Sequence, residues 1–344
     1  MRRVPQLKWA VPSNGTALFL CQIQTRIARR PRYRGVHMDS FPKSELQTGD
    51  AESALSDFEL TSESLISVDY IAPPAAISDY VTTLYHFRCD EPLIRDIQPA
   101  SVGHLAIFPR GRGHMHFRGG YSDPNPGTAI MTPLSTAVPI VVEGPFHVIG
   151  AALSPLGWAA LTGLHAGKAR DRLRPAREVL GADADTLGER LNTAYRDGSM
   201  SGKECALAIG EFISSHARPI NPRHRDLIRI VNMWLGASLN PVLDDLMDAA
   251  AYSPRQVQRL TERYFGLPPR ALARKYRALR AAALLSFPQL TPEFEYELGE
   301  AFFDQSHMIR EITRFVGRTP ARLTDERAPY LAELIDPKNL RELG

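Results

Sequence analysis

The C-terminal third of the chain contains an internal repeat, and this repeat restricts the folds that the chain can adopt. Both copies follow the pattern R-x6-G-x2-P-x2-L, and the second copy begins 51 residues after the first. The matched residues are Arg259, Gly266, Pro269 and Leu272 in the first copy and Arg310, Gly317, Pro320 and Leu323 in the second. A repeat with Gly and Pro at fixed offsets predicts that one supersecondary unit is built twice.

Each copy predicts a short first helix with one apolar stripe. In both stripes the apolar residues recur at the three- and four-residue spacing of a helix face. The stripes consist of Leu243, Leu246, Met247 and Ala250, and of Phe294, Leu298, Ala301 and Phe302. Asn240-Pro241 and Thr291-Pro292 predict where these helices start, because an N-cap oxygen followed by proline favours a helix start.

A second helix follows in each copy after a tight turn. Ser253-Pro254 and Asp304 predict its start, while Gly266 and Gly317 supply the left-handed conformation that ends many helices. The predicted buried faces are Val257, Leu260 and Tyr264 in the first copy and Met308, Ile312, Phe315 and Val316 in the second. Two short helices joined by a tight turn form a helix-turn-helix, and here there are two.

The faces that these second helices leave exposed are polar and basic. They carry Arg255, Gln258, Arg259 and Arg263 in the first unit, and Ser306, Ile309, Arg310 and Arg314 in the second. Arg can make two hydrogen bonds to a guanine edge and Gln can make two to adenine. Residues 254–280 contain eight basic residues and one acid, Glu262. Solvated helix faces are also often rich in arginine, but the duplicated unit favours DNA binding.

The segments YSPRQVQRLTERYFGLPPRAL and FFDQSHMIREITRFVGRTPARL resemble the paired helix-turn-helix domain of the AraC/XylS transcription regulators. The resemblance covers about residues 222–325. It implies a linker helix over residues 270–285 and two recognition helices in successive major grooves. It also implies double-stranded DNA and RNA polymerase as partners, a small-molecule effector, a homodimer and a role in activation.

The predicted DNA-binding residues fall into two groups. Those on or beside the recognition helices are Arg255, Gln258, Arg259, Arg263, Ser306, His307, Arg310 and Arg314. The predicted phosphate contacts are Arg270, Lys275, Arg318 and Arg322. Phosphate contacts position a protein on DNA, whereas base contacts select the sequence.

The N-terminal half predicts a β-rich domain. Short apolar runs separated by Gly and Pro predict strands, and they are ISVDYI, VTTLYHF, GHLAIF, HMHF, TAIM, PIVV and FHVIGAAL. Such strands are typical of a small barrel or cupin-like fold. Helical patterns follow in PLGWAALTGL, DADTLGERLNTAYRDG and GKECALAIGEFISSHA. IAPPAAISDYV and GPFHVIGAALSPLGWAALTGL resemble a β-rich sensor-type domain, which implies effector binding or dimerisation.

The predicted fold is therefore α+β and multidomain. Residues 1–64 are predicted to be a disordered extension, because the first 37 residues are basic without any acid and residues 39–64 are acidic and rich in Ser. Residues 65–220 form the β-rich regulatory domain with trailing helices, residues 221–326 the all-α DNA-binding domain and residues 327–344 a tail. Three separated cysteines and no apolar run of about 20 residues predict a cytoplasmic protein without a membrane span.

One alternative is a metal- or ligand-binding cupin-like enzyme with an accessory DNA-binding domain. His114 and His116 alternate on one predicted strand, and His104 and His147 could join them around a metal ion. The following segment offers only Asp123 where such a site usually has Glu. Polar histidines on strands explain the pattern better, so no metal, cofactor or catalytic residue is predicted. Arg110, Arg112 and Arg118 flank the pair and could attract an anionic effector.

The two units are expected to differ in sequence discrimination. Ser306 and Ile309 are weaker base readers than Arg255 and Gln258, so Arg259→Ala should relax base preference more than Arg310→Ala. Binding-site selection with each variant measures this preference. A larger loss of preference in Arg310→Ala would contradict the ranking.

Overall fold

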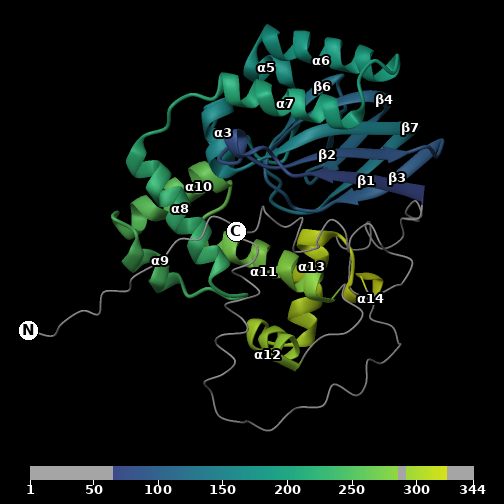
Figure 1. The fold of residues 1–344 in the computed structure, drawn as a ribbon. Coiled ribbons are helices and arrows are strands. Elements are labelled where there is room, and N and C mark those ends of the chain that lie inside the picture. Colours follow the sequence, from purple (N-terminus) through teal and green to yellow (C-terminus); the bar gives the residue numbers. More distant parts are fainter. Residues whose placement is uncertain (1–64, 286–291, 324–344) are drawn as a thin grey trace, which may run out of the picture. The chain divides into compact units, whose positions relative to one another are not determined.

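The computed structural model describes residues 65–285 and 292–323, all within the compact unit Ala54–Gly344 (Figure 1). The predictions for residues 1–64 and 327–344 lie outside the described residues. A β-rich region precedes an all-helical region, which confirms the predicted fold class. None of the described helices combines the length and the apolar character that crossing a membrane requires.

The β-rich region contains one antiparallel sheet with the order β1-β2-β7-β4-β6-β8, while β3 pairs with β7 and β5 with β4. The strands are β1 (Ile66–Ile71), β2 (Val81–Cys89), β3 (Leu93–Gln98), β4 (His104–Phe117), β5 (Tyr121–Pro124), β6 (Thr128–Met131), β7 (Val138–Leu153) and β8 (Leu173–Pro175). β4 and β7 pair from His104↔Ala152 to Met115↔Ile140. Register shifts around Arg110 interrupt this pairing. The long β4–β7 pair is thus the centre of the sheet.

The structure merges runs that the sequence pattern separated. GHLAIF and HMHF are parts of β4, and PIVV and FHVIGAAL are parts of β7. The sequence prediction divided each strand because Pro and Gly usually end strands. Here Gly111 adopts a φ of 83° at the irregular part of β4, which lets the chain bulge and continue. The short strands β3, β5 and β8 were not predicted.

Helices cover one face of the sheet (Figure 1). They include α3 (Pro155–Thr162), α6 (Ala182–Arg196) and α7 (Gly202–His216), with the shorter η2 (Ala75–Ile77), α4 (Ala166–Ala169) and α5 (Ala176–Leu180) beside them. Leu105, Ile107 and Ile149 pack there against Trp158 and Leu191. Gly188 allows α6 to approach β6 closely, because an added Cβ would lie 1.6 Å from Thr128 Oγ1. The opposite face buries a separate cluster of Phe87, Cys89, Ile94, Ala106, Val142, Phe146 and Val148.

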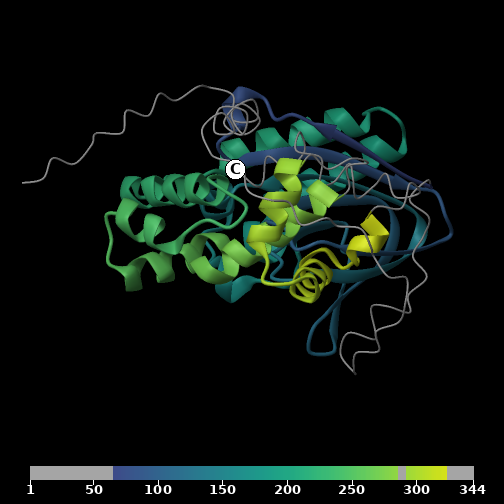
Figure 2. The same ribbon diagram turned by 90° about the horizontal axis from the view of Figure 1, so that it is seen from below.

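The helical region contains both predicted helix-turn-helix units (Figure 2). Its elements are α8 (Pro222–Gly236), α9 (Leu243–Ala249), α10 (Pro254–Phe265), α11 (Pro269–Leu285), α12 (Pro292–Ala301), α13 (Gln305–Val316) and α14 (Pro320–Leu323). The first unit is α9 and α10, the second is α12 and α13, and α11 is the linker helix. The buried stripes of both units join one apolar core.

The prediction that α9 starts at Asn240-Pro241 is wrong. This helix begins at Leu243, and its N-cap residue Val242 makes no side-chain capping hydrogen bond. Asn240 instead accepts a hydrogen bond from Arg277 of α11, at 3.0 Å. At the start of α12, Pro292 is the first helical residue, whereas Thr291 lies outside the described residues.

The second helix-turn-helix unit is attached to the β-rich region through its backbone. The Ala100 amide donates to the Phe315 carbonyl at 2.7 Å, and the Ala137 amide donates to the Arg314 carbonyl at 3.0 Å. The last carbonyls of a helix have no partner within the helix. These two bonds therefore satisfy the C-terminal end of α13 and hold it against the sheet.

Buried charges reinforce this attachment. Arg318 and Asp96 form an ion pair at 2.5 Å, with only 4% and 3% of their side chains exposed. The Lys275 ammonium donates to the carbonyls of Ser101 at 2.8 Å and Leu134 at 3.2 Å. All of these partners lie in the β-rich region. Lys275 and Arg318 thus connect the linker helix and the second unit to that region.

Removing Asp96 should destabilise the protein strongly. Asp96→Ala leaves the buried Arg318 guanidinium without its carboxylate, which should lower the free energy of unfolding by about 3–5 kcal/mol. Urea denaturation of the full chain measures this loss. Asp226→Ala, at an exposed position of α8, is the matched control and should stay within about 0.5 kcal/mol of wild type. Equal stabilities of the two variants would contradict the importance of the ion pair.

Candidate nucleic-acid interface

The first recognition helix, α10, starts with a complete capping box. The Ser253 side chain accepts from the Gln256 amide at 3.4 Å, and the Gln256 side chain accepts from the Ser253 amide at 3.2 Å. At the other end Gly266 has a φ of 86°, which confirms its predicted left-handed conformation. Local sequence therefore defines both ends of the helix.

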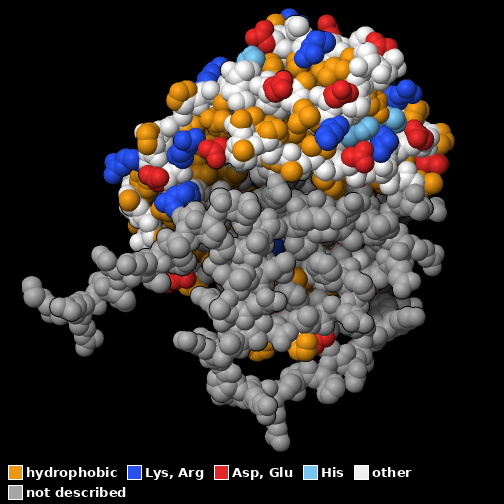
Figure 3. Space-filling view, in the orientation of Figure 1, with side chains coloured by type: hydrophobic (Ala, Val, Ile, Leu, Met, Phe, Trp, Pro, Cys, Tyr) orange, Lys and Arg blue, Asp and Glu red, His pale blue; other side chains and the backbone are white. Residues whose placement is uncertain are grey.

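The polar face of α10 is exposed as the periodicity predicted. Arg255, Gln258, Arg259 and Arg263 are all exposed. Val257, Leu260 and Tyr264 are buried on the opposite face, together with Thr261. Lys and Arg side chains, with acidic ones among them, lie over the region of α8 and α10 on the left of Figure 3. The exposed cations of α10 can therefore reach a ligand.

The second recognition helix, α13, is capped by Asp304. The Asp304 carboxylate accepts a hydrogen bond from the His307 amide at 2.6 Å, and Gly317 ends the helix with a φ of 86°. The His307 ring is half-buried, accepts from the Phe303 amide at 3.4 Å and packs edge-on against Phe302. His307 thus fixes the turn of the second unit.

The outward face of α13 presents fewer polar groups than that of α10. Ser306, Arg310 and Arg314 are exposed, while Ile309 is half-buried. Ile312, Phe315 and Val316 are buried as predicted, and Met308 is partly buried against the same core. Within the ranges that the structure describes, Arg255, Arg259 and Arg310 make no ion pair, so their guanidinium groups remain available to phosphates or bases.

Glu311 is a buried charged residue beside the candidate interface that the sequence analysis did not single out. Only 5% of its side chain is exposed, and Arg274 of α11 donates to both of its carboxylate oxygens, at 3.0 and 2.5 Å. A second linker residue, Arg277, lies 3.7 Å from Glu311 Oε2. The sequence could have indicated this burial, because Glu311 lies between Met308 and Ile312 on the apolar stripe of the helix. A bidentate carboxylate–guanidinium pair fixes orientation as well as distance.

Arg277 connects the linker helix to both units. Its guanidinium donates to Asn240 Oδ1 at 3.0 Å ahead of α9, and lies 5.0 Å from the centre of the Phe302 ring at the end of α12. With the Glu311 contact, this side chain meets α13 and the segments that precede α9 and follow α12. Arg274 and Arg277 thus hold α13 in a fixed orientation on α11.

Charge, hydrogen bonding and burial oppose one another at Glu311. Burial raises the pKa of this carboxyl group, but the hydrogen bonds from Arg274 and the charges of Arg274 and Arg277 outweigh it, so the net pKa is lowered. A carboxyl group whose pKa is lower in the folded than in the unfolded state stabilises the folded state at pH values above the unfolded-state pKa. That stabilisation is lost as the pH falls through the folded pKa.

The predicted phosphate contacts have different outcomes. Arg270 is exposed at the start of α11. Lys275 and Arg318 are only 2% and 4% exposed and are bound to the β-rich region, so in this structure neither can contact a phosphate. This corrects the expectation for both residues. The Arg322 side chain lies outside the described residues.

The histidines of the alternative metal site do not converge. His114 and His116 are exposed neighbours on β4. His104 bonds to the Tyr85 hydroxyl at 3.1 Å, and His147 bonds to Tyr195 at 2.7 Å. Among the described residues, no three His, Cys, Asp or Glu side chains form a group that could hold a metal ion.

Comparisons with known proteins found one matching domain family and several similar solved structures. A helix-turn-helix domain family matches residues 246–326. Similar solved structures include ToxT from Vibrio cholerae O395, with 10% identity, a TM-score of 0.41 and coverage of 80% of this chain and 98% of that chain. Another is the AraC-like transcriptional activator CuxR, with 13% identity, a TM-score of 0.29 and coverage of 63% and 86%. No curated protein matches the chain in sequence.

Glu311→Ala should loosen the second recognition helix. Removing this carboxylate leaves Arg277 without its buried counter-charge and should lower the free energy of unfolding by about 3 kcal/mol at pH 7. The loss should shrink as the pH falls below the ordinary glutamate pKa of 4.5 and through the lowered pKa of Glu311. Urea titrations at several pH values test both expectations. Glu300→Ala, at an exposed position of α12, is the control and should change stability little.

Proposed function

We propose that this chain, a DNA-binding transcription regulator with an AraC-type helix-turn-helix domain, reads two successive major grooves of its operator with α10 and α13. The observation that carries the proposal is the pair of capped helices, each of which buries an apolar stripe and exposes arginine on its opposite face. An exposed arginine on such a helix fits the major groove.

The exposed residues divide into two roles. Arg255, Gln258 and Arg259 of α10 are proposed to contact base edges, as are Ser306 and Arg310 of α13. The remaining exposed cations are proposed to contact phosphates, and they are Arg263, Arg270 and Arg314. His307 is proposed to position α13 near the DNA backbone through its contacts in the turn. Phosphate contacts made by these side chains would be independent of sequence.

The linker helix supports a two-groove arrangement. α11 has 17 residues, which corresponds to a length of about 25 Å at 1.5 Å per residue. Successive major grooves on one DNA face are about 34 Å apart. A rigid spacer of this order, with one helix-turn-helix at each end, supports simultaneous reading of both grooves.

The β-rich region is proposed to control DNA binding in the cytoplasm. Its direct bonds to Phe315, Arg314 and Lys275 give it a physical connection to α11 and α13. A ligand that changes the sheet near Ala100 or Ala137 would therefore act on the second recognition helix. We further propose that a small-molecule effector controls this region and that the region forms a homodimer. The regulator is also proposed to contact RNA polymerase. Analytical ultracentrifugation of the full chain measures whether the homodimer forms.

DNA binding by the full chain is the direct test. We expect the selected operator to bind with an affinity that falls steeply with salt, because several phosphate contacts release counterions. Arg259→Ala should weaken specific binding by about 1–3 kcal/mol, since it removes a base contact. Fluorescence anisotropy over a range of salt concentrations measures both quantities.

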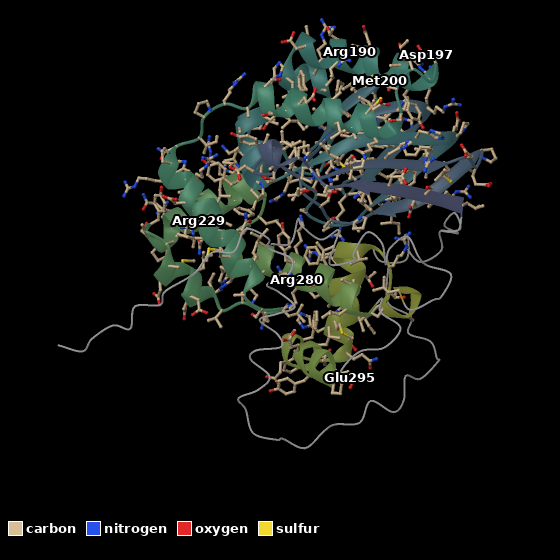
Figure 4. The ribbon with its side chains drawn as sticks, in the orientation of Figure 1. Arg190, Asp197, Met200, Arg229, Arg280 and Glu295 are labelled. Atoms are coloured by element: carbon tan, nitrogen blue, oxygen red, sulfur yellow. The ribbon has the colours of Figure 1, made fainter. Side chains whose placement is uncertain are left out.

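Arg229 provides the matched control for this test. It is an exposed arginine on α8, the helix that packs beside α10, and it is not part of either recognition helix (Figure 4). Arg229→Ala removes the same charge and should leave the affinity for the selected operator within about twofold of wild type. The proposal fails if the wild-type chain selects no sequence, or if Arg229→Ala and Arg259→Ala weaken binding equally.

A further inference from the structure

A polar cavity lies in the β-rich region, apart from the proposed DNA-binding surface. Its volume is about 410 Å³, and its walls come from the irregular part of β4, the loop between β5 and β6, and α6. The side chains that matter here are Arg110, Arg112, Asn125, Glu189, Asn192 and Arg196. Three elements that are distant in sequence thus converge on one space.

Hydrogen bonds hold the three walls together. The carbonyl of Gly127 accepts from the Phe108 amide at 3.0 Å and from Asn192 Nδ2 at 2.9 Å, so the loop is bound to both β4 and α6. Asn125 Nδ2 donates to the Gly111 carbonyl at 3.3 Å, at the bulge of β4. The walls are therefore fixed before any ligand binds, which reduces the entropic cost of binding.

The charge of the lining is strongly positive. Arg110, Arg112 and Arg196 face one carboxylate, Glu189, which gives a formal charge of +2. In the part of the chain that the structure describes, none of these four residues makes an ion pair. Arg196 Nε donates to the Asn192 backbone carbonyl at 3.0 Å, which holds the Arg196 side chain along its own helix, α6. Unpaired guanidinium groups in a concave site favour a compact dianion.

Asn192 fixes the loop between β5 and β6 against α6. Only 7% of this residue is exposed, and its Nδ2 donates to the Gly127 carbonyl. Its Oδ1 is buried without a hydrogen-bond partner among the described residues. A buried acceptor without a donor costs free energy. Because Oδ1 is buried, it is out of reach of a ligand in the cavity, and the charge of the lining is what selects the ligand.

We propose that this cavity binds a small phosphate monoester. A phosphate monoester has a charge close to −2 at pH 7, which matches the lining, and its oxygens accept the paired N–H groups of arginine. A ligand of this class would be the effector of the regulator. That regulatory role rests on the proposed function, whereas binding in the cavity does not.

Isothermal titration calorimetry of the full chain without DNA tests the site, with glycerol 3-phosphate as the probe. We expect a dissociation constant below about 1 mM. Arg110→Gln and Arg196→Gln, in two different walls, should each weaken binding about tenfold.

Arg190→Gln is the matched control. Arg190 is exposed on the same helix as Arg196 but does not line the cavity (Figure 4). It should bind the probe as wild type does. Absence of binding by the wild-type chain would overturn the proposal, and so would equal weakening in Arg190→Gln and Arg196→Gln. Because DNA is absent, a failure of DNA binding would overturn the proposed function and leave this site unaffected.

Discussion

The contact between Glu311 and the two linker arginines organises the helical region. Arg274 holds both carboxylate oxygens, and Arg277 extends the contact to Asn240 and Phe302. Because the carboxylate is buried, its charge must be compensated by cations in a fixed geometry. The orientation of α13 on α11 therefore depends on this polar cluster. The bidentate geometry fixes the direction of the contact as well as its distance.

The same linker helix is also bound to the β-rich region. Lys275 binds two carbonyls of that region, while Arg280 donates to the carbonyls of Leu235 and Ser238 at the end of α8. Figure 4 labels Arg280 in this part of the fold. Four basic residues of α11, Arg274, Lys275, Arg277 and Arg280, are thus used in structural contacts, whereas Arg270 of the same helix is exposed. The basic residues of α11 therefore stabilise the packing of this helix against α8, α13 and the β-rich region.

The recognition helices could be predicted closely and their surroundings could not. Capping by Ser253 and Asp304, termination at Gly266 and Gly317, and the exposed faces of α10 and α13 all follow from contacts within a few residues. The roles of Lys275 and Arg318 did not follow, because their partners lie in another region of the chain. The cavity around Asn192 was equally hidden, although Arg110 and Arg112 were recognised as candidates for an anion.

The sequence by itself determined the two helix-turn-helix units, because helix periodicity, capping residues and left-handed glycines act over distances of a few residues. The tertiary structure alone decided which cations are free to meet DNA. Arg274 finds Glu311 at a separation of 37 residues, and Arg318 finds Asp96 at a separation of 222. The local sequence around an arginine does not tell whether its side chain will bind a phosphate or a buried carboxylate. That depends only on what the fold brings beside it.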